Sequence, residues 1–366
     1  MLEVSLDVAV RSKLKLAKPV YGASGQIMLQ KGVVLTASYA RGLRKFGFYS
    51  VFVEGGKVDV HSPVREVVRS RASKVLYAFT QGSSHNINVR ESAALILDDV
   101  LALGGVLDNI NSLSLYDGYT FAHSIDVSIL SIAIASEMGY GRRILLEIAM
   151  GALLHDIGKI KIPQNTINKI GKLTDDEMTD VKNHTLIGYE LAKSHPQLSK
   201  RSTTMILEHH ERYDGSGYPH GKRDRDINLS SVICGISDVY NAMTTNRCYR
   251  KAYPAHEVYQ YILGLGNTHF DYSTVQAFAK VIMPYPKGRM VRISDGRIAQ
   301  VAENSSGHPY LPLVIFLEEE TYTPVDLYKE GLTIKEPLTN EEVEALIENG
   351  RVPVMEDREL YDPSCL

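Results

Sequence analysis

Apolar helical segments between residues 115 and 283 carry histidine and aspartate side chains inside them or at their edges. His155 and Asp156 end the apolar run ALLHD, His184 lies in VKNHTLIGYEL, and Asp238 lies in VICGISDVYNAM. A polar group in an apolar segment is costly to bury unless it is hydrogen-bonded, paired or bound to a metal. The pattern therefore predicts an all-helical core that contains either satisfied polar side chains or a metal site.

The two flanks of this region have strand-like patterns. Residues 1 to 62 are rich in Val and in Gly-containing turns, and the pattern changes to helical periodicity after Ser62-Pro63. Near residues 283 to 290, two prolines and a glycine end the helical pattern, and Asp295-Gly296 then predicts a β-hairpin. Thr339 and Glu342 are spaced as the capping box of a short helix.

We therefore expect a multidomain α+β chain with a helical core between two small β-rich modules. The predicted boundaries are 1–62 for the β-rich N-terminal module, 63–283 for the helical region, and 284–366 for the β-rich C-terminal module with a short helical tail.

The composition argues against a protein that binds nucleic-acid polymers or anionic membranes through a broad basic surface. The 366 residues are 44% hydrophobic and 23% charged, with a formal net charge of -3. This balance argues against a broad basic surface for a nucleic-acid polymer or an anionic membrane. The three cysteines form no C-x-x-C pair, and the N-terminus lacks the order of a signal peptide. The most apolar region, 125 to 154, is interrupted by Glu137, Arg142, Arg143 and Glu147. We predict a cytoplasmic protein without an integral membrane segment.

The pair His155-Asp156 has two interpretations. If the helix continues through HDIGK, Lys159 shares a face with His155, whereas Asp156 points roughly 100° away around the axis. Adjacent side chains could then meet one metal and extend toward a second. The alternative is a buried histidine beside an acid that ends the helix.

Seven candidate metal ligands lie in or at the edges of the apolar segments of this region, and together they favour the metal site. Five histidines and two aspartates could hold two ions, with Asp156 between them. Imidazoles mixed with carboxylates, without thiolates, favour iron, manganese or a similar ion over an all-oxygen magnesium site. The seven are His123, His155, Asp156, His184, His209, His210 and Asp238.

The stretch HHERYDGSGYP, residues 209 to 219, places two adjacent histidines before a loop with two glycines. In isolation the loop fits an ordinary turn. Beside a metal site it fits a flexible segment over the substrate.

Five spaced motifs carry a family resemblance over about 150 residues, from 116 to 265: YDGYTFAHS, LLHDIGKIKIP, KLTDDEMTDVKNHTLIGYEL, EHHERYDGSGYPHGK and ISDVYNAMTTNRCYRKA. In this order they resemble the HD-GYP family, a branch of the HD-domain metal-dependent phosphohydrolases. The resemblance implies a signalling enzyme with a helical HD-type catalytic core. It would hydrolyse a cyclic dinucleotide, with cyclic di-GMP as the usual substrate and linear pGpG, with or without GMP, as the product.

Carried over by position, the family's metal ligands fall on the seven side chains named above, and Asp156 takes the bridging place. The resemblance implies two divalent ions, iron or manganese, whose bridging hydroxide attacks phosphorus while Lys159 steadies the phosphate. The signature loop of the family falls on Gly217, Tyr218 and Pro219, which we expect beside the substrate.

Arg247 and Arg250 match the basic phosphate-contacting positions of the family. Arginine can bind a phosphate through two hydrogen bonds. For Arg247 to share a pocket with Asp238, the intervening helix has to end near residues 244 to 246. The alternative is a pair of solvated surface arginines.

Two positions depart from the family pattern. Tyr119 stands where some members have a glutamate that helps to hold a third metal, and Asn241 stands where a second aspartate is common. These departures predict two ions and not three.

Two other functions stay open at this point. The substrate could be another cyclic dinucleotide, such as cyclic GMP-AMP. The chain could also be a non-catalytic receptor whose β-rich flanks contact protein partners, although a receptor has no need for every metal ligand.

Overall fold

The computed structural model describes residues 2–5, 13, 15–21, 26–45, 50–53, 64, 66–80, 88–102, 121–167, 169, 171–245, 252–285, 287–303, 308–317, 323–339, 342–343 and 345–346. The chain divides into two compact units, Met1–Ile282 and Met283–Leu366. The division into three modules stays a prediction.

The first unit begins with two small antiparallel sheets and a helix. Strand β1 (Leu2–Ser5) pairs with β4 (Ser50–Val53), and β2 (Val20–Tyr21) pairs with β3 (Ile27–Leu29). Helix α2 (Ala37–Lys45) lies between β3 and β4 in the sequence. One apolar cluster joins these elements, and it contains Leu16, Val20, Leu35, Ala40, Leu43, Val51 and Val53. The β-rich N-terminal prediction is thus correct in kind, although each sheet has only two strands.

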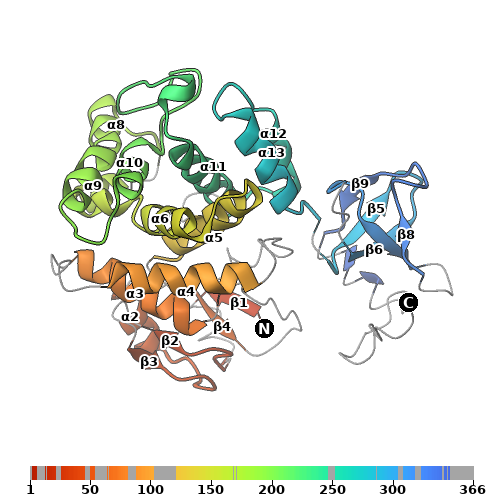
Figure 1. Ribbon diagram of the computed structural model, residues 1–366. Helices are drawn as coiled ribbons and strands as arrows, with labels where there is room; N and C mark the ends of the chain where they lie inside the picture. The colour runs from red at the N-terminus through yellow and green to blue at the C-terminus, as the bar shows by residue number, and fades with distance from the viewer. Residues whose placement is uncertain are drawn as a thin grey trace. The chain divides into compact units, whose positions relative to one another are not determined.

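A layered arrangement of helices follows. These elements are α3 (Glu66–Thr80), α4 (Val89–Ala102), α5 (Ala122–Glu137), α6 (Arg142–Leu153), the 3-10 helix η3 (Ile157–Lys161), α7 (Gln164–Ile167), α8 (Asp175–Lys182), α9 (His184–Ala192), α10 (Lys200–Glu208), the 3-10 helix η4 (Asp224–Asp226), α11 (Leu229–Thr244), α12 (Ala255–Leu263) and α13 (Tyr272–Val281). In Figure 1, α3 and α4 lie along one side of α5 and α6, and α8 to α11 lie on the other side. The prediction of a helical core is confirmed.

Helix α5 is the centre of this unit. Residues 124 to 135 are all buried, including the serines, because α5 packs against α6, α11, α4 and α13. Ser128 donates its hydroxyl proton to the carbonyl of Ala149 on α6, at 3.1 Å, so the small polar side chain is satisfied at a close helix contact. None of the described helices is both long enough and apolar enough to span a membrane.

Side-chain caps begin several of the helices around the centre. Thr174 and Glu177 form a reciprocal capping box at α8. The side chains of Ser199, Asn228 and Asp271 accept hydrogen bonds from backbone N–H groups at the starts of α10, α11 and α13. Each cap satisfies a donor that has no partner within its helix. Where these helices begin is therefore encoded locally.

A buried ion pair joins α3 to α5. Arg69 donates from Nη2 to Oδ1 of Asp126 at 2.6 Å, and the two side chains are 0% and 3% exposed. Burial raises the pKa of Asp126, while Arg69, His123 and Asn241 act in the opposite direction. The pair thus links α3 to α5, the helix that also carries His123.

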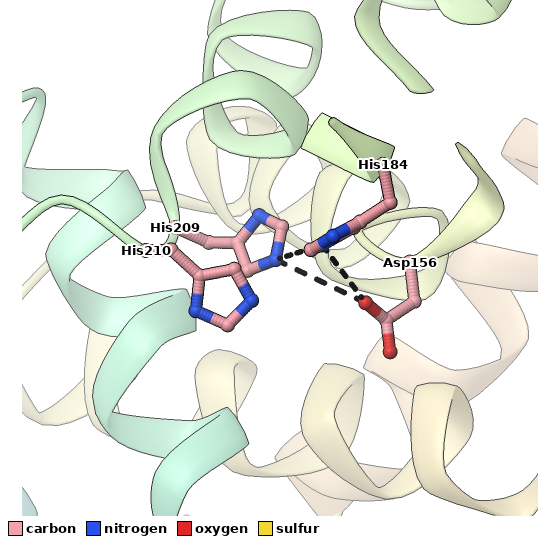
Figure 2. A group of neighbouring side chains, drawn as sticks. All are labelled: Asp156, His184, His209 and His210. Atoms are coloured by element: carbon pink, nitrogen blue, oxygen red, sulfur yellow. Dashed lines mark hydrogen bonds and ion pairs between the residues drawn. The ribbon is translucent and has the colours of Figure 1, made fainter. Parts of the chain in front are cut away.

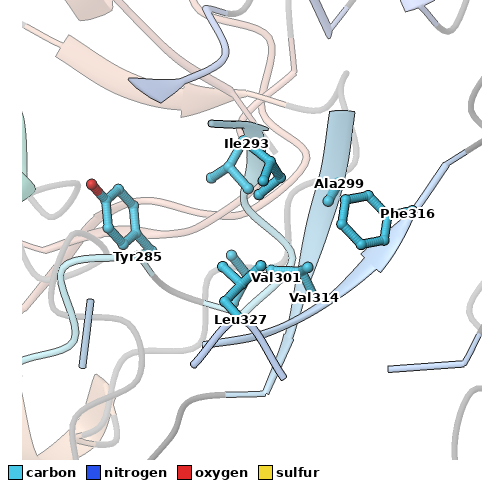
Figure 3. Close-up of a cluster of buried hydrophobic side chains, with 8 residues drawn as sticks. Tyr285, Ile293, Ala299, Val301, Val314, Phe316 and Leu327 are labelled. Atoms are coloured by element: carbon cyan, nitrogen blue, oxygen red, sulfur yellow. The ribbon is translucent and has the colours of Figure 1, made fainter. Parts of the chain in front are cut away.

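The second unit contains a five-stranded antiparallel sheet with strand order β8-β7-β6-β5-β9. Its strands are β5 (Met290–Ile293), β6 (Ile298–Glu303), β7 (Leu313–Phe316), β8 (Val325–Asp326) and β9 (Ile334–Pro337). Buried apolar side chains form the core drawn in Figure 3, which includes Tyr285, Ile293, Ala299, Val301, Val314, Phe316 and Leu327.

Two local predictions about this unit are confirmed. A hairpin joins β5 to β6 at Asp295-Gly296, where Gly296 has a φ of 94° that favours glycine. The capping box is also formed, because Glu342 donates its backbone N–H to Oγ1 of Thr339 at 3.2 Å and accepts the backbone N–H of Thr339 at 2.8 Å.

Candidate metal centre

The seven predicted ligands come from five parts of the helical unit and lie in two neighbouring groups. The first group is Asp156, His184, His209 and His210, and the second is His123, His155 and Asp238. In each group, one ligand atom of every member lies within 4.8 Å of those of the others. Helices α5 and α11 supply His123 and Asp238, the turn after α6 supplies the His-Asp pair, and the remaining histidines lie at the start of α9 and the end of α10.

The first group is arranged around one carboxylate oxygen. Oδ1 of Asp156 lies 3.4 Å from Nε2 of His184 and 4.0 Å from Nε2 of His209. The two imidazole nitrogens lie 3.3 Å from each other. Figure 2 shows this oxygen directed toward the two rings, while the other oxygen of Asp156 points away from them.

The second group faces that other oxygen. Oδ2 of Asp156 lies 3.4 Å from Nε2 of His155 and 3.7 Å from Nε2 of His123. Oδ1 of Asp238 lies 3.1 Å from Nε2 of His123 and 4.0 Å from Nε2 of His155. Asp156 therefore presents one oxygen to each group, which is the geometry a bridging carboxylate requires.

Backbone carbonyls orient three of the imidazoles in the same way. Nδ1 of His155, His184 and His209 lies 2.8, 2.6 and 3.0 Å from the carbonyl oxygen of the residue three positions earlier. A carbonyl only accepts, so each Nδ1 carries the proton in the neutral ring and each Nε2 keeps its lone pair. The three lone pairs are thereby directed into the site.

Two of the imidazole nitrogens fit a metal ion better than a hydrogen-bonded core. Nε2 of His123 and Nε2 of His155 are buried and make no hydrogen bond with any described residue. A buried acceptor without a donor is unfavourable, and a divalent cation would satisfy both atoms. The nitrogen and carboxylate ligands, without thiolates, suit iron, manganese or a similar first-row ion.

Electrostatics favours the protonation states that bind metals. Burial lowers the pKa of His209 well below its ordinary value, lowers the pKa of His184, and lowers the pKa of His210 to about 3. Burial raises the pKa of Asp156, but Lys159 and the nearby imidazoles outweigh it, and the pKa lies well below the ordinary range. For Asp238 the imidazoles of His123, His155 and His210 outweigh burial, and its pKa also lies well below the ordinary range. The carboxylates are ionised near neutral pH, and His184, His209 and His210 are neutral.

The pKa of His155 shifts in the other direction. Its burial lowers the pKa, but Asp156 and Asp238 outweigh that effect and raise it. A metal ion and a proton would therefore compete for the Nε2 of this ring.

A family comparison matches this part of the chain. Residues 109–274 match the model of a family described as the HD domain. This region is an HD domain. All seven predicted ligands fall inside it.

Named relatives agree with this assignment. The chain is 36% identical over 223 residues to the cyclic di-GMP phosphodiesterase PA4108 of Pseudomonas aeruginosa, with 59% of this chain and 54% of the relative covered. It is 39% identical over 178 residues to a cyclic di-GMP phosphodiesterase of Thermotoga maritima, with 48% of each covered. A 3'3'-cGAMP-specific phosphodiesterase 1 of Vibrio cholerae is 31% identical over 167 residues, with 44% of this chain and 37% of the relative covered. The chain spans about half the length of the first two relatives.

The HDIGK segment of the HD domain differs from its predicted geometry. Helix α6 ends at Leu153, and the chain turns into η3 from Ile157. The expectation that Lys159 shares a helix face with His155 is therefore wrong. In 3-10 geometry residues three apart lie on one side, and Nζ of Lys159 accordingly donates to Oδ2 of Asp156 at 2.6 Å.

Gly158 brings this segment against α9. A Cβ at this position would lie 1.9 Å from the carbonyl oxygen of His184 and 2.6 Å from the backbone nitrogen of Gly188. Since both obstacles are backbone atoms, only glycine allows the close approach that places Asp156 beside His184.

Two more glycines enclose the double histidine. A Cβ at Gly217 would lie 2.5 Å from the carbonyl oxygen of His210, and a Cβ at Gly235 of α11 would lie 2.5 Å from the carbonyl oxygen of His209. The ring of Tyr218 stacks on His210, with centroids 4.7 Å apart and planes 25° apart. The Gly217-Tyr218-Pro219 loop thus supports the candidate ligands as well as lying beside them.

Several residues of the HD domain were missed by the sequence analysis. Buried Glu211 accepts the backbone N–H groups of His220 and Lys222 at 2.8 and 2.9 Å and so holds the loop after the signature. Glu208 accepts from Nζ of Lys222 at 2.5 Å. The signal was present in the sequence, because two glutamates beside an apolar helix end need partners when they are buried.

The predicted substrate contacts are only partly described. Arg247, Arg250 and Tyr119 lie outside the described residues. Helix α11 does end at Thr244, within the range that a shared pocket for Arg247 and Asp238 required.

Proposed function

We propose that this chain is a metal-dependent phosphodiesterase that hydrolyses a cyclic dinucleotide, with cyclic di-GMP as the first candidate. The observation that carries the proposal is Asp156, whose two oxygens face two separate groups of imidazole and carboxylate ligands. The named relatives from Pseudomonas aeruginosa and Thermotoga maritima are cyclic di-GMP phosphodiesterases, which supports this substrate class.

Two divalent ions, iron or manganese, would be held by His184, His209 and His210 on one side and by His123, His155 and Asp238 on the other, with Asp156 shared. When bound, such a pair of ions lowers the pKa of water and neutralises charge on a phosphoryl group. The carbonyl-bound imidazoles and the ionised carboxylates keep this ligand set rigid, so that little reorganisation is needed.

Lys159 takes the role of a phosphate-binding residue. Its side chain is 36% exposed, and its Nζ already lies beside Asp156 at the edge of the site. An ammonium group here can remain within reach of a phosphate while it stabilises the carboxylate. Charge that develops on the phosphate during hydrolysis would be offset by the same group.

Arg247 and Arg250 are proposed to bind the second phosphate or the flanking ribose-phosphate of the substrate. Gly217, Tyr218 and Pro219 are proposed to border the substrate, with Tyr218 holding the ring of His210 from behind. We further propose a cytoplasmic location, and protein partners for the β-rich flanks.

A second substrate, 3'3'-cGAMP, has a specific observation in its favour, because two relatives named for that specificity, both from Vibrio cholerae, are 31% and 32% identical to this chain over 167 and 124 residues. The receptor alternative is disfavoured by the complete set of seven ligand side chains.

The test is product analysis. Manganese-loaded and iron-loaded protein would be incubated with cyclic di-GMP, 3'3'-cGAMP and cyclic di-AMP, and the products separated by ion-pair chromatography. We expect cyclic di-GMP to give the linear dinucleotide at the highest rate. Metal analysis of protein purified without chelator should find close to two ions per chain. Two bound ions without hydrolysis of any of the three substrates would instead indicate a receptor.

A further inference from the structure

Helix α11 contacts both ring nitrogens of His123. Oδ1 of Asp238 lies 3.1 Å from Nε2, and Oδ1 of Asn241, one turn later, lies 2.6 Å from Nδ1. Asn241 is 1% exposed, so water does not compete for this contact. The imidazole is therefore held from two sides by side chains of a single helix.

His123 differs from the other oriented imidazoles in what holds its Nδ1. His155, His184 and His209 use backbone carbonyls, which substitution of a side chain does not remove. The described partner of His123 is the amide side chain of Asn241. The orientation of the His123 ring therefore depends on the identity of a residue outside the ligand set.

The amide oxygen determines the tautomer. It accepts a hydrogen bond and cannot donate one, so Nδ1 of His123 carries the proton and Nε2 keeps its lone pair. In the opposite tautomer Nε2 would carry a proton toward Asp238 and could not bind a metal. An unheld neutral imidazole would divide between the two forms and would also rotate.

We propose that Asn241 is a positioning residue that sets the tautomer and ring orientation of His123, and thereby the metal affinity of the His123, His155 and Asp238 group. The inference rests on the proposed function, because both take His123 as a metal ligand. It assigns a role to a position that departs from the usual aspartate of the resembling family.

The surroundings explain why an amide suits this position. Asp126 is close enough for Asn241 and His123 both to lower its pKa, and Arg69 is its ion-pair partner. A carboxylate at position 241 would add a second buried negative charge near Asp126. The neutral amide supplies the acceptor without that added charge.

The test uses manganese as the probe and compares three variants with the full chain. Asn241→Leu removes the acceptor at similar volume, Asn241→Asp keeps it, and Thr244→Val is the matched control. Thr244 is buried one turn further along α11, and its hydroxyl bonds the carbonyl of Tyr240 within the same helix. Competition titration with a chelating dye would measure each binding step.

We expect two binding steps in the wild-type chain. Asn241→Leu should weaken one of them by about ten- to a hundredfold, the usual effect of removing a group that orients a metal ligand, and leave the other nearly unchanged. Asn241→Asp should restore the weakened step, and Thr244→Val should leave both steps intact. Asn241→Ser, too short to reach His123, should behave like Asn241→Leu and replaces it if that variant does not fold.

A second readout is the tautomer itself. Nitrogen NMR of chain labelled in histidine, recorded without metal, should show His123 protonated at Nδ1 in the wild type and divided between tautomers in Asn241→Leu. Equal manganese affinity of both steps in a folded Asn241→Leu or Asn241→Ser variant would overturn the inference. So would a loss that a folded Asn241→Asp variant does not rescue even in part, because the oxygen acceptor at position 241 would then have no effect on the affinity. A wild-type chain that binds fewer than two ions would instead refute the proposed function.

Discussion

Replacement of Gly158 by alanine tests whether the close approach of η3 to α9 builds the site. The added Cβ would lie 1.9 Å from the carbonyl oxygen of His184, about 1.5 Å closer than the 3.4 Å at which ordinary contact begins. It would also meet Gly188 at 2.6 Å. Both neighbours are backbone atoms, so no side chain can turn aside and the two segments have to separate.

The expected loss of stability is near the upper end of the range for overpacking, about 3 kcal/mol. The relative effect on metal binding should be larger than the relative effect on the free energy of unfolding. Metal–ligand distances tolerate deviations of about 0.2 Å, and a separation near 1.5 Å would move Asp156 away from His184, whose atoms now lie 3.4 Å apart. The ion shared by these two ligands should therefore be lost first.

The assay combines urea unfolding of the metal-free Gly158→Ala variant with manganese titration of the folded protein. Gly42→Ala is the matched control, because Gly42 lies in helix α2 and a Cβ there would have no neighbour within 4 Å. The control should gain roughly 0.5 to 1 kcal/mol from helix propensity. A Gly158→Ala variant with wild-type unfolding free energy and wild-type manganese affinity would refute this account of the glycine.

Four further outcomes are expected. Asp156→Ala should abolish hydrolysis and reduce the metal content measured by mass spectrometry, since no neighbour can replace a carboxylate that faces both groups; wild-type turnover would contradict this. Arg247→Ala should weaken binding of a cyclic dinucleotide about ten- to a hundredfold, for the loss of one charge-assisted contact, with the metals retained; calorimetry that finds unchanged affinity would place Arg247 on the surface. Arg69→Met should lower the free energy of unfolding by about 3 to 5 kcal/mol, whereas the double variant with Asp126→Leu should recover most of that loss in the same urea assay. For metal-free protein in chelator, the free energy of unfolding should fall as the pH drops below about 6.5. Burial lowers the pKa of His210 to about 3 in the folded chain, so below about pH 6.5 the unfolded chain binds more protons than the folded chain. A urea midpoint that does not change across this range would contradict the prediction.

Local patterns predicted much of this molecule. The helical core, the hairpin at Asp295-Gly296 and the capping box of Thr339 and Glu342 depend on periodicity and on residues a few positions apart, and all three are found. The seven side chains of the two candidate ligand groups drew attention in the sequence because a polar residue in an apolar segment is costly to bury without a partner, and the structure brings them together.

The remaining features depend on contacts between distant segments. The pairing of Lys159 with Asp156 depends on the end of α6 at Leu153, and the sequence near Leu153 contains no proline or other signal that predicts the end of a helix there. The need for Gly158 arises from a backbone far along the chain, and the role of Asn241 from a helix that begins more than a hundred residues earlier. The spacing of residues along the sequence gives no information about these contacts between distant segments.

The ion pair of Arg69 and Asp126 determines which fragment of this chain can be isolated in a folded form. The HD-domain match begins at residue 109, but Arg69 belongs to α3, well before that boundary. A fragment cut at the family boundary would keep Asp126 in the centre of α5 and discard its cation, which leaves a buried carboxylate that has to be neutralised or hydrated. The smallest piece of this chain that we expect to fold independently with the two ligand groups intact therefore begins before α3.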